Sequence, residues 1–378
     1  MRGYSDMTNH RRRRKPNYPP EFQALLDKAR KAEGPSAPRK HHLVPASYLR
    51  RWADDKLIRV RDLERDRSYL AAPEQAARET DYYSMASPDI DPTEVSPLLF
   101  ETLLGELEGR AVGTIDKLLI MQPWEIPSEE MAYFTWYLSF QVTRGHAYRQ
   151  QMTFITNDYF RLLYSEITDE GLLKILRKNG APATAEDVAA ARRGVEDLLA
   201  GRLEIRQQDA ALVGSSAESA GALGSALLSR DWQVYKTPKT LITCDEPVVR
   251  IGGPGDKRDE RLGLGVAPIL VFPLSPEALL VMSKDADRLR PPYELDPIEC
   301  SEINREILAS ASRWAFERAS KRHTELLQVP LRFPQLKREG PLPMAEGQEH
   351  HELYRIYSPT RWAGEEHPPP WPVSRWFP

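Results

Sequence analysis

The stretch KHHLVPASYLRRW, from Lys40 to Trp52, places two histidines, a proline, a tyrosine and two arginines within thirteen residues. Pro45 suits the first turn of a helix, because proline has no N–H group to leave unpaired there. His42 would lie just before that helix, where free backbone N–H groups favour negative charge. A histidine there can bind a metal ion, transfer a proton or face an anion, and it can equally hydrogen-bond a carbonyl and pack. His41 is expected to point to solvent.

The composition of the whole chain is that of an ordinary globular protein. It has 378 residues, 41% of them apolar and 28% charged, with a net charge of -3. This balance argues against affinity for nucleic acid over the whole surface, although local basic patches remain compatible with it. No apolar run approaches the roughly 20 residues of a membrane span, and the amino end lacks the apolar core of a signal peptide. We therefore expect a cytoplasmic protein with no membrane partner, whose two cysteines, Cys244 and Cys300, are reduced and buried.

Residues 1–39 are predicted to form a basic leader that is disordered or partly helical. Arg11–Lys15 is a run of five cations, which normally stays solvated. Contact with the phosphates of nucleic acid is the functional alternative, and nucleic acid is the partner that this run could bind. Apolar spacing between Glu21 and Lys31 predicts one short amphipathic helix.

The next residues, 40–230, are predicted to be the helical part of a single globular domain that spans 40–325. Near its start, Lys56–Leu63 alternates with period two and Ser68–Ala71 can return beside it, which predicts a small β-hairpin. A helical piece is expected around Glu74–Glu79. An apolar stripe from Phe100 to Leu118 then predicts a clear amphipathic helix.

Two glutamates, Glu101 and Glu108, each follow a stripe residue by one position, so both should lie on the rim of the buried face. They are separated by about 10.5 Å along the helix axis, which is too wide for both to hold one ion without a third group. The following helix should begin near Ser128. It places Gln141 and Arg144 one turn apart.

The composition changes at Asp231, after which short apolar runs separated by Pro, Gly and Asp predict an antiparallel meander. A final helix should start at Asp296-Pro297, with Trp314 on its inner face. Residues 326–378 are a Pro- and Trp-rich extension. The predicted fold class is α+β, mainly α-helical, with an antiparallel β-meander in the second half and a small β-hairpin near the start.

Four segments and one dipeptide form a recognisable combination. They are HLVPASYLRRW (His42–Trp52), FETLLGELEG (Phe100–Gly109), TCDEPVV (Thr243–Val249), FPLSPEALLVM (Phe272–Met282) and Ile303-Asn304. In this order and spacing they resemble the bacterial family called domain of unknown function 4238, over about residues 40–321. The chain departs from the family pattern at Trp52, where phenylalanine is commoner. It also departs at Glu246, which replaces an asparagine and adds a negative charge beside Asp245.

The resemblance implies a set of matched polar residues from five elements: His42, Glu101, Glu108, Arg144, Asp245 and Asn304. The hypothesis is that they converge in one pocket between the helical half and the meander. A histidine with several carboxylates suits Mg²⁺ or Mn²⁺, and an arginine can neutralise a phosphoryl oxygen. The function that follows is metal-assisted hydrolysis of a phosphodiester or nucleic acid.

In that hypothesis each residue has a role. His42 is a general base or ligand, Glu101, Glu108 and Asp245 are metal ligands, and Arg144 and Asn304 orient the substrate. No organic cofactor is predicted, because the chain has no Gly-rich phosphate loop.

The alternative is a non-catalytic module for ligand binding or protein interaction, and the sequence leaves the choice open, leaning to a hydrolase. Each polar residue also has a structural explanation: Asp245 suits an Asx turn, the glutamates suit a solvated rim, and Arg144 suits a buried ion pair. The polar set would then be a buried hydrogen-bond network. The aromatic helix segment Tyr133–Phe140 and the Pro/Trp tail would be the contact surfaces.

Overall fold

The computed structural model describes residues 20–34, 39–88, 90–91, 94–333, 336–342 and 353–377. The basic run Arg11–Lys15 lies outside the described residues. Within them the fold is α+β and mainly helical, with antiparallel sheets, as the sequence predicts. The first helix, α1 (Pro20–Lys31), confirms the short amphipathic helix.

The chain then forms a small antiparallel pair, β1 (Lys40–His42) with β4 (Arg78–Thr80). Between them lie α2 (Ala46–Leu49), η1 (Arg50–Trp52), the confirmed hairpin β2 (Ile58–Asp62) and β3 (Arg67–Ala71), and η2 (Pro73–Gln75). The prediction of a helix around Glu74–Glu79 is wrong. Only one 3-10 turn forms, because the residues after it pair with β1 and must be extended.

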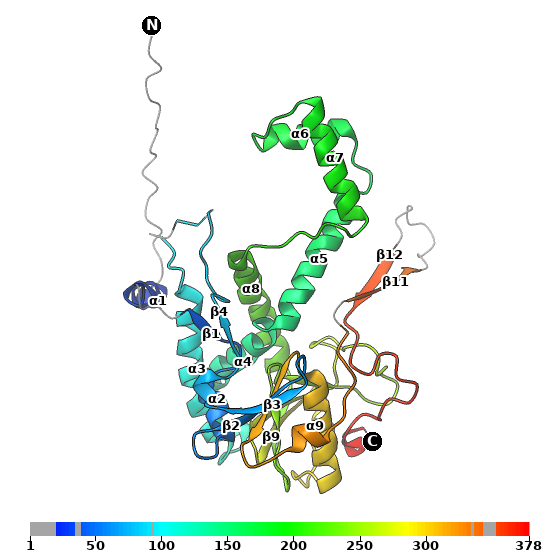
Figure 1. Ribbon diagram of the computed structural model, residues 1–378. Helices are drawn as coiled ribbons and strands as arrows, with labels where there is room; N and C mark the ends of the chain where they lie inside the picture. The colour runs from blue at the N-terminus through cyan, green and yellow to red at the C-terminus, as the bar shows by residue number, and fades with distance from the viewer. Residues whose placement is uncertain are drawn as a thin grey trace.

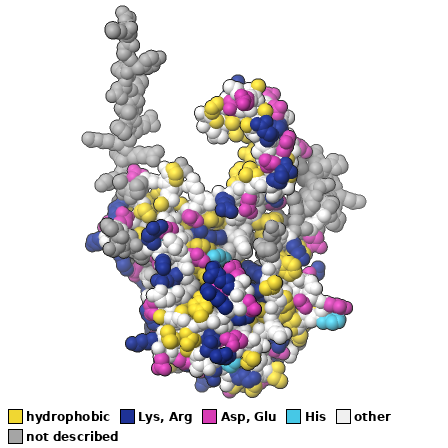
Figure 2. All heavy atoms as spheres, viewed as in Figure 1, with side chains coloured by type: hydrophobic (Ala, Val, Ile, Leu, Met, Phe, Trp, Pro, Cys, Tyr) yellow, Lys and Arg dark blue, Asp and Glu magenta, His cyan; other side chains and the backbone are white. Residues whose placement is uncertain are grey.

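Six helices follow, and three of them form the body of the helical half. They are α3 (Leu99–Leu118), α4 (Ser128–Thr143), α5 (His146–Tyr164), α6 (Asp169–Lys178), α7 (Ala185–Leu199) and α8 (Asp209–Leu228), with η3 (Pro123–Glu125) between the first two. Helix α4 packs against both α3 and α8, whereas α5 leads away from the body to an arm made of α6 and α7 (Figure 1). In the space-filling view this arm stands clear, and Lys and Arg side chains lie among Asp and Glu side chains over the body (Figure 2).

The second half contains the predicted meander as a sheet of order β5-β9-β8-β7, formed by β5 (Asp231–Lys236), β7 (Val249–Ile251), β8 (Ile269–Ser275) and β9 (Ala278–Ser283). One predicted strand, β6 (Thr243–Cys244), leaves the meander and joins a second sheet of order β3-β2-β10-β6. The final helix, α9 (Pro297–Ser310), is capped by Asp296, whose carboxylate accepts the N–H groups of Ile298 and Glu299.

Trp314 does not lie on that helix, so this prediction is wrong. It begins strand β10 (Trp314–Arg318), which is hydrogen-bonded between β2 and β6. The remaining elements are η4 (Ala286–Arg288), α10 (His323–Leu326), β11 (Lys337–Leu342), β12 (Leu353–Tyr357) and η5 (Ser374–Trp376). Within the described ranges, no helix has the length and apolar character needed to cross a membrane.

Two aromatic side chains connect the Lys40–Trp52 stretch to the sheets of the second half. The buried Tyr48 hydroxyl donates to the Pro273 carbonyl at 2.8 Å and lies 2.8 Å from the Thr243 hydroxyl. The Trp52 indole N–H donates to the Leu241 carbonyl at 2.9 Å. Because both rings are fully buried, these contacts fix the position of the short stretch between the two halves.

The Pro/Trp extension packs against the glycine pair that follows β7. Trp376 is 1% exposed, and the Trp371 ring lies over Gly252 so closely that a Cβ atom added there would be 2.6 Å from it. Glycine is therefore required at this position for the tail to dock.

Replacing Gly252 by alanine should destabilise the protein by about 1–3 kcal/mol, because the new methyl group overpacks the Trp371 contact. Urea unfolding followed by tryptophan fluorescence measures this change. Gly265→Ala is the matched control, since nothing lies within 4 Å of a Cβ atom at Gly265. Equal unfolding midpoints for the two variants would show that the tail does not dock on this glycine.

Candidate functional site

Four of the predicted site residues come together beside the end of α4. Arg144 donates from Nη1 to Glu108 Oε1 at 2.7 Å, and its side chain is 1% exposed. Glu101 lies on the same helix as Glu108, close enough for the charges of Glu108 and Arg144 to act on it. His42, at the end of β1, is likewise influenced by Glu108 and Arg144. These four residues, His42, Glu101, Glu108 and Arg144, are called the His42 cluster below.

The buried ion pair at the centre of the cluster is held from two sides. Arg144 also donates from Nη2 to Gln141 Oε1 at 3.0 Å, which is the contact expected from their one-turn spacing. The Tyr83 hydroxyl donates to the backbone carbonyl of Arg144 at 3.4 Å. Charge-assisted hydrogen bonds of this kind are strong, so the positions of Glu108 and Arg144 are fixed.

Glu101 differs from Glu108 in having no hydrogen bond or ion pair among the residues that the structure describes. Burial raises the pKa of its carboxyl, the neighbouring Glu108 raises it further, and Arg144 only partly opposes them, so that the pKa is about 7. Glu101 is therefore divided between its protonated and ionised forms near neutral pH. Such a group can both donate and accept a proton.

A backbone contact determines which tautomer the His42 ring adopts. Its Nε2 atom lies 3.2 Å from the Glu74 carbonyl oxygen. Because a carbonyl only accepts, Nε2 carries the hydrogen, and the lone pair of the neutral ring is on Nδ1. Burial lowers the pKa of His42 and outweighs the raising effects of the Glu74 carbonyl and Glu108, so the ring is neutral at pH 7. His42 is thus oriented as a base or a ligand.

Sequence reasoning missed the residues around this ring and wrongly placed the neighbouring His41 in solvent. Arg78 of β4 lies directly opposite His42 of β1 in the antiparallel ladder, and its charge lowers the pKa of His42. His41 is 1% exposed, and its Nδ1 accepts the Tyr83 N–H at 2.7 Å, so the expectation that it points to solvent is wrong. The signal was present in the sequence, because adjacent strand residues face opposite sides and only one of the two can face outward.

The carboxylate of Asp245 is occupied by backbone groups rather than by residues of the cluster. Asp245 is 4% exposed and accepts the N–H groups of Ser312 at 2.8 Å, Arg313 at 2.8 Å and Trp314 at 3.1 Å. Burial raises the pKa of Asp245 to about 6, and the nearby Glu246 adds to this rise, whereas the three N–H groups oppose it. The residue therefore holds the loop that enters β10.

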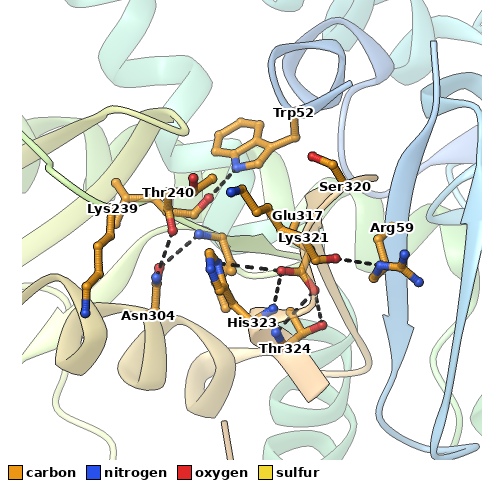
Figure 3. Close-up of polar contacts among 12 residues, drawn as sticks. Trp52, Arg59, Lys239, Thr240, Asn304, Glu317, Ser320, Lys321, His323 and Thr324 are labelled. Carbon is orange, nitrogen blue, oxygen red and sulfur yellow. Dashed lines mark hydrogen bonds and ion pairs between the residues drawn. The ribbon is translucent and has the colours of Figure 1, made fainter. Parts of the chain in front are cut away.

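Asn304 is also used for a backbone contact. Its Oδ1 accepts the Ile242 N–H at 2.9 Å, and its Nδ2 donates to the Thr240 carbonyl at 3.0 Å (Figure 3). The amide thus fastens α9 to the segment that leads into β6. The charges of four of the six predicted residues act on one another, whereas the side chains of Asp245 and Asn304 are occupied by backbone contacts. Among the described residues, no group of three or more His, Cys, Asp and Glu is arranged to hold a metal ion.

Comparison with known proteins agrees with the motifs that define the cluster. The chain belongs to the family described as "Protein of unknown function (DUF4238)", which it matches over residues 40–321. This match begins at the first residue of β1 and includes all four residues of the His42 cluster. No curated protein and no solved structure matches the chain.

The raised pKa of Glu101 predicts how stability depends on pH. The folded protein binds the Glu101 proton more tightly than the unfolded chain between pH 4.5 and about 7, so its contribution to the free energy of unfolding falls as pH rises through this window. The shift corresponds to at most about 3 kcal/mol. Glu101→Gln should remove this contribution and make the protein more stable than wild type at pH 8.

Urea unfolding of both proteins at pH 5 and pH 8 tests this difference. Glu106→Gln is the control, because Glu106 lies on the same helix but is exposed and pairs with Lys28. If Glu101→Gln and Glu106→Gln show the same dependence on pH, the carboxyl of Glu101 is not perturbed.

Proposed function

We propose that the protein is a hydrolase of phosphoric esters, with phosphodiesters of nucleic acid as the substrate class, and that the His42 cluster transfers the protons. One observation supports this proposal above the others. A neutral histidine with its lone pair on Nδ1 and a partly protonated, unpaired Glu101 are both within reach of the charges of the same Glu108–Arg144 pair. A general base and a general acid of this kind are what ester hydrolysis requires.

In the proposed reaction the two groups have opposite tasks. His42 takes a proton from the attacking water at Nδ1, and Glu101 in its protonated form gives a proton to the oxygen of the leaving group. Acids and bases work best when their pKa values are near the working pH, which is the condition that burial creates for Glu101. Glu108 raises the pKa of His42, so it supports the imidazolium that forms in the reaction.

The phosphoryl charge requires a cation other than Arg144, whose side chain is almost fully covered. We assign this role to Arg78, which is half-buried beside His42 on the neighbouring strand. Its guanidinium could pair with two phosphoryl oxygens. The basic run Arg11–Lys15 remains the proposed contact for a longer nucleic acid.

Divalent metal is a separate part of the proposal. Since three N–H groups occupy the Asp245 carboxylate and Arg144 occupies Glu108, Mg²⁺ or Mn²⁺ would be held by Glu101 in its ionised form, which is an alternative to the protonated form that acts as the acid. Mg²⁺ commonly binds in this way, through one or two carboxylates with the other ligands supplied by substrate and water.

The alternative, a module for protein interaction, is less well supported. The aromatic helix segment and the Pro/Trp tail were its expected contact surfaces, and most of their large aromatic rings are covered. Phe134, Tyr137 and Phe140 of the aromatic helix segment are buried in the core, and Trp376 of the tail is buried as well. Trp136 is 43% exposed and is what this segment leaves at the surface. One half-exposed ring is a small contact area for a protein partner.

The hydrolase proposal predicts that His42→Ala and Glu101→Gln lose activity by at least about 100-fold, the usual contribution of a general acid or base. Bis-p-nitrophenyl phosphate, p-nitrophenyl phosphate and single- and double-stranded nucleic acids are assayed with EDTA and with Mg²⁺ or Mn²⁺. Activity should fall above pH 7 as Glu101 loses its proton. Glu106→Gln should retain wild-type activity.

Two results would contradict the proposal. One is a lack of hydrolysis of every phosphoric ester in all metal conditions. The other is hydrolysis by His42→Ala and Glu101→Gln at the rate of Glu106→Gln.

A further inference from the structure

Three adjoining hollows each have at least one of Arg250, Arg261 and Arg332 in their lining. The largest, a groove of about 630 Å³, meets a smaller cavity at Arg332 and Pro359. That cavity shares Arg250 and Arg261 with a third hollow, which adjoins the groove at Gln151. Together they form one region, called the arginine groove below. The volume of its main part is that of a site for a small organic ligand.

Three arginines of this region surround one carboxylate. Arg261 forms an ion pair with Glu246, and Arg332 Nη1 lies 3.4 Å from Glu246 Oε1. Arg250 is influenced by all three of these charges, yet its guanidinium has no hydrogen-bond or ion-pair partner within the described part of the chain. Three cations against one anion leave an excess of positive charge in a largely covered place, which is unfavourable without a further anion.

The other charges around the small cavity reduce this excess without removing it, since five arginines line it against Glu260 and Glu306, with Glu246 beside them. Arg258 is matched by Glu306, with Nη1 3.2 Å from Oε2. Arg361 donates only to the backbone carbonyls of Pro330 and Ala311. Glu260 is the remaining acidic group in the lining. Burial and the neighbouring arginines lower the pKa of Arg250 to about 9, and Glu246 only partly opposes them.

The groove beside this cavity has the chemistry of a site for a planar, phosphorylated ligand. Its lining contains the aromatic rings of Phe154 and Phe333, together with amide side chains. The groove is also lined by three further arginines and two acidic residues. They are Arg149, Arg161, Arg206, Glu204 and Asp209. Arg149 is already paired with Asp209 at 2.7 Å. Aromatic faces stack on nucleobases, whereas guanidinium groups bind phosphates.

We propose that the arginine groove binds a nucleotide, with its phosphate at Arg250, Arg261 and Arg332 and its base against Phe154 and Phe333. The site is distinct from the His42 cluster and does not depend on the hydrolase proposal. Free nucleoside phosphates and nucleotides within a single strand offer the same phosphate and base. Glu246 holds Arg261 and Arg332 in place in the absence of the ligand.

Binding to the full-length protein tests this site directly. Isothermal titration calorimetry with AMP, ATP and inorganic phosphate, and fluorescence anisotropy with a labelled 12-nucleotide DNA strand, give the affinities. Arg250→Met should weaken nucleotide binding at least tenfold. The same variant should fold with at least wild-type stability, because it removes a covered charge that has no partner. Arg193→Met on the α7 arm is the control, since Arg193 is exposed and the change in net charge is the same.

The outcomes separate the two sources of the ligand. Binding of AMP or ATP that Arg250→Met loses supports a free nucleotide, and binding of the strand alone with the same loss supports nucleic acid. Binding of inorganic phosphate without a gain from the nucleoside would overturn the nucleotide site. So would the absence of all binding, or equal affinities for Arg250→Met and Arg193→Met. Glu101→Gln leaves this groove intact, so this variant should bind nucleotide as wild type does. The binding test therefore stands whether or not the protein hydrolyses phosphoric esters.

Discussion

The buried ion pair between Arg144 and Glu108 is the constraint on which the candidate site depends. An arginine with a covered side chain needs a counterion, because an unpaired charge in this position is strongly destabilising. The pair therefore holds the rim of α3 against the end of α4. By binding one of the two glutamates on that rim, Arg144 leaves the other without a cation of its own. The raised pKa of Glu101 is caused first by burial and then by the charge of Glu108, and Arg144 only partly opposes these two effects.

A second constraint brings His42 to this pair. Tyr48 and Trp52 connect the short stretch around α2 to residues about 190 to 225 positions later, so the stretch is fixed between the two halves. Strand β1 enters this stretch directly and pairs with β4. The alternation of a strand then directs His41 toward Tyr83 and His42 toward the cluster. His42 is therefore positioned by an aromatic anchor rather than by a loop.

Much of the fold was predictable because its signals are local. The apolar stripe of α3, the alternation of the β2–β3 hairpin and the Asp296 cap each depend on residues within a few turns of one another. What could not be predicted depends on pairing between distant segments. β4 is a strand only because β1 lies beside it, and Trp314 is in a strand because β10 lies between β2 and β6.

The same distinction divides the candidate site. The rim positions of Glu101 and Glu108 and the spacing of Gln141 and Arg144 follow from helix geometry. The role of Asp245 does not, since its three N–H partners come from residues about 67 to 69 positions later. The arginine groove was also invisible in the sequence. Its cations are scattered from α5 to the C-terminal segment, and their excess over Glu246 appears only when they are brought together.

The site depends on electrostatic coupling, in which the charges of Glu108 and Arg144 shift the pKa of the His42 ring in opposite directions. The most direct measurement is a pH titration of the His42 ring by ¹⁵N NMR, in wild type and in Glu108→Gln. The account predicts a neutral ring with its hydrogen on Nε2 at pH 7 and a pKa below 6.5. It also predicts a further fall in Glu108→Gln, because Arg144 then acts on the ring without its counterion. A ring that titrates near 6.5 in both proteins would contradict the account.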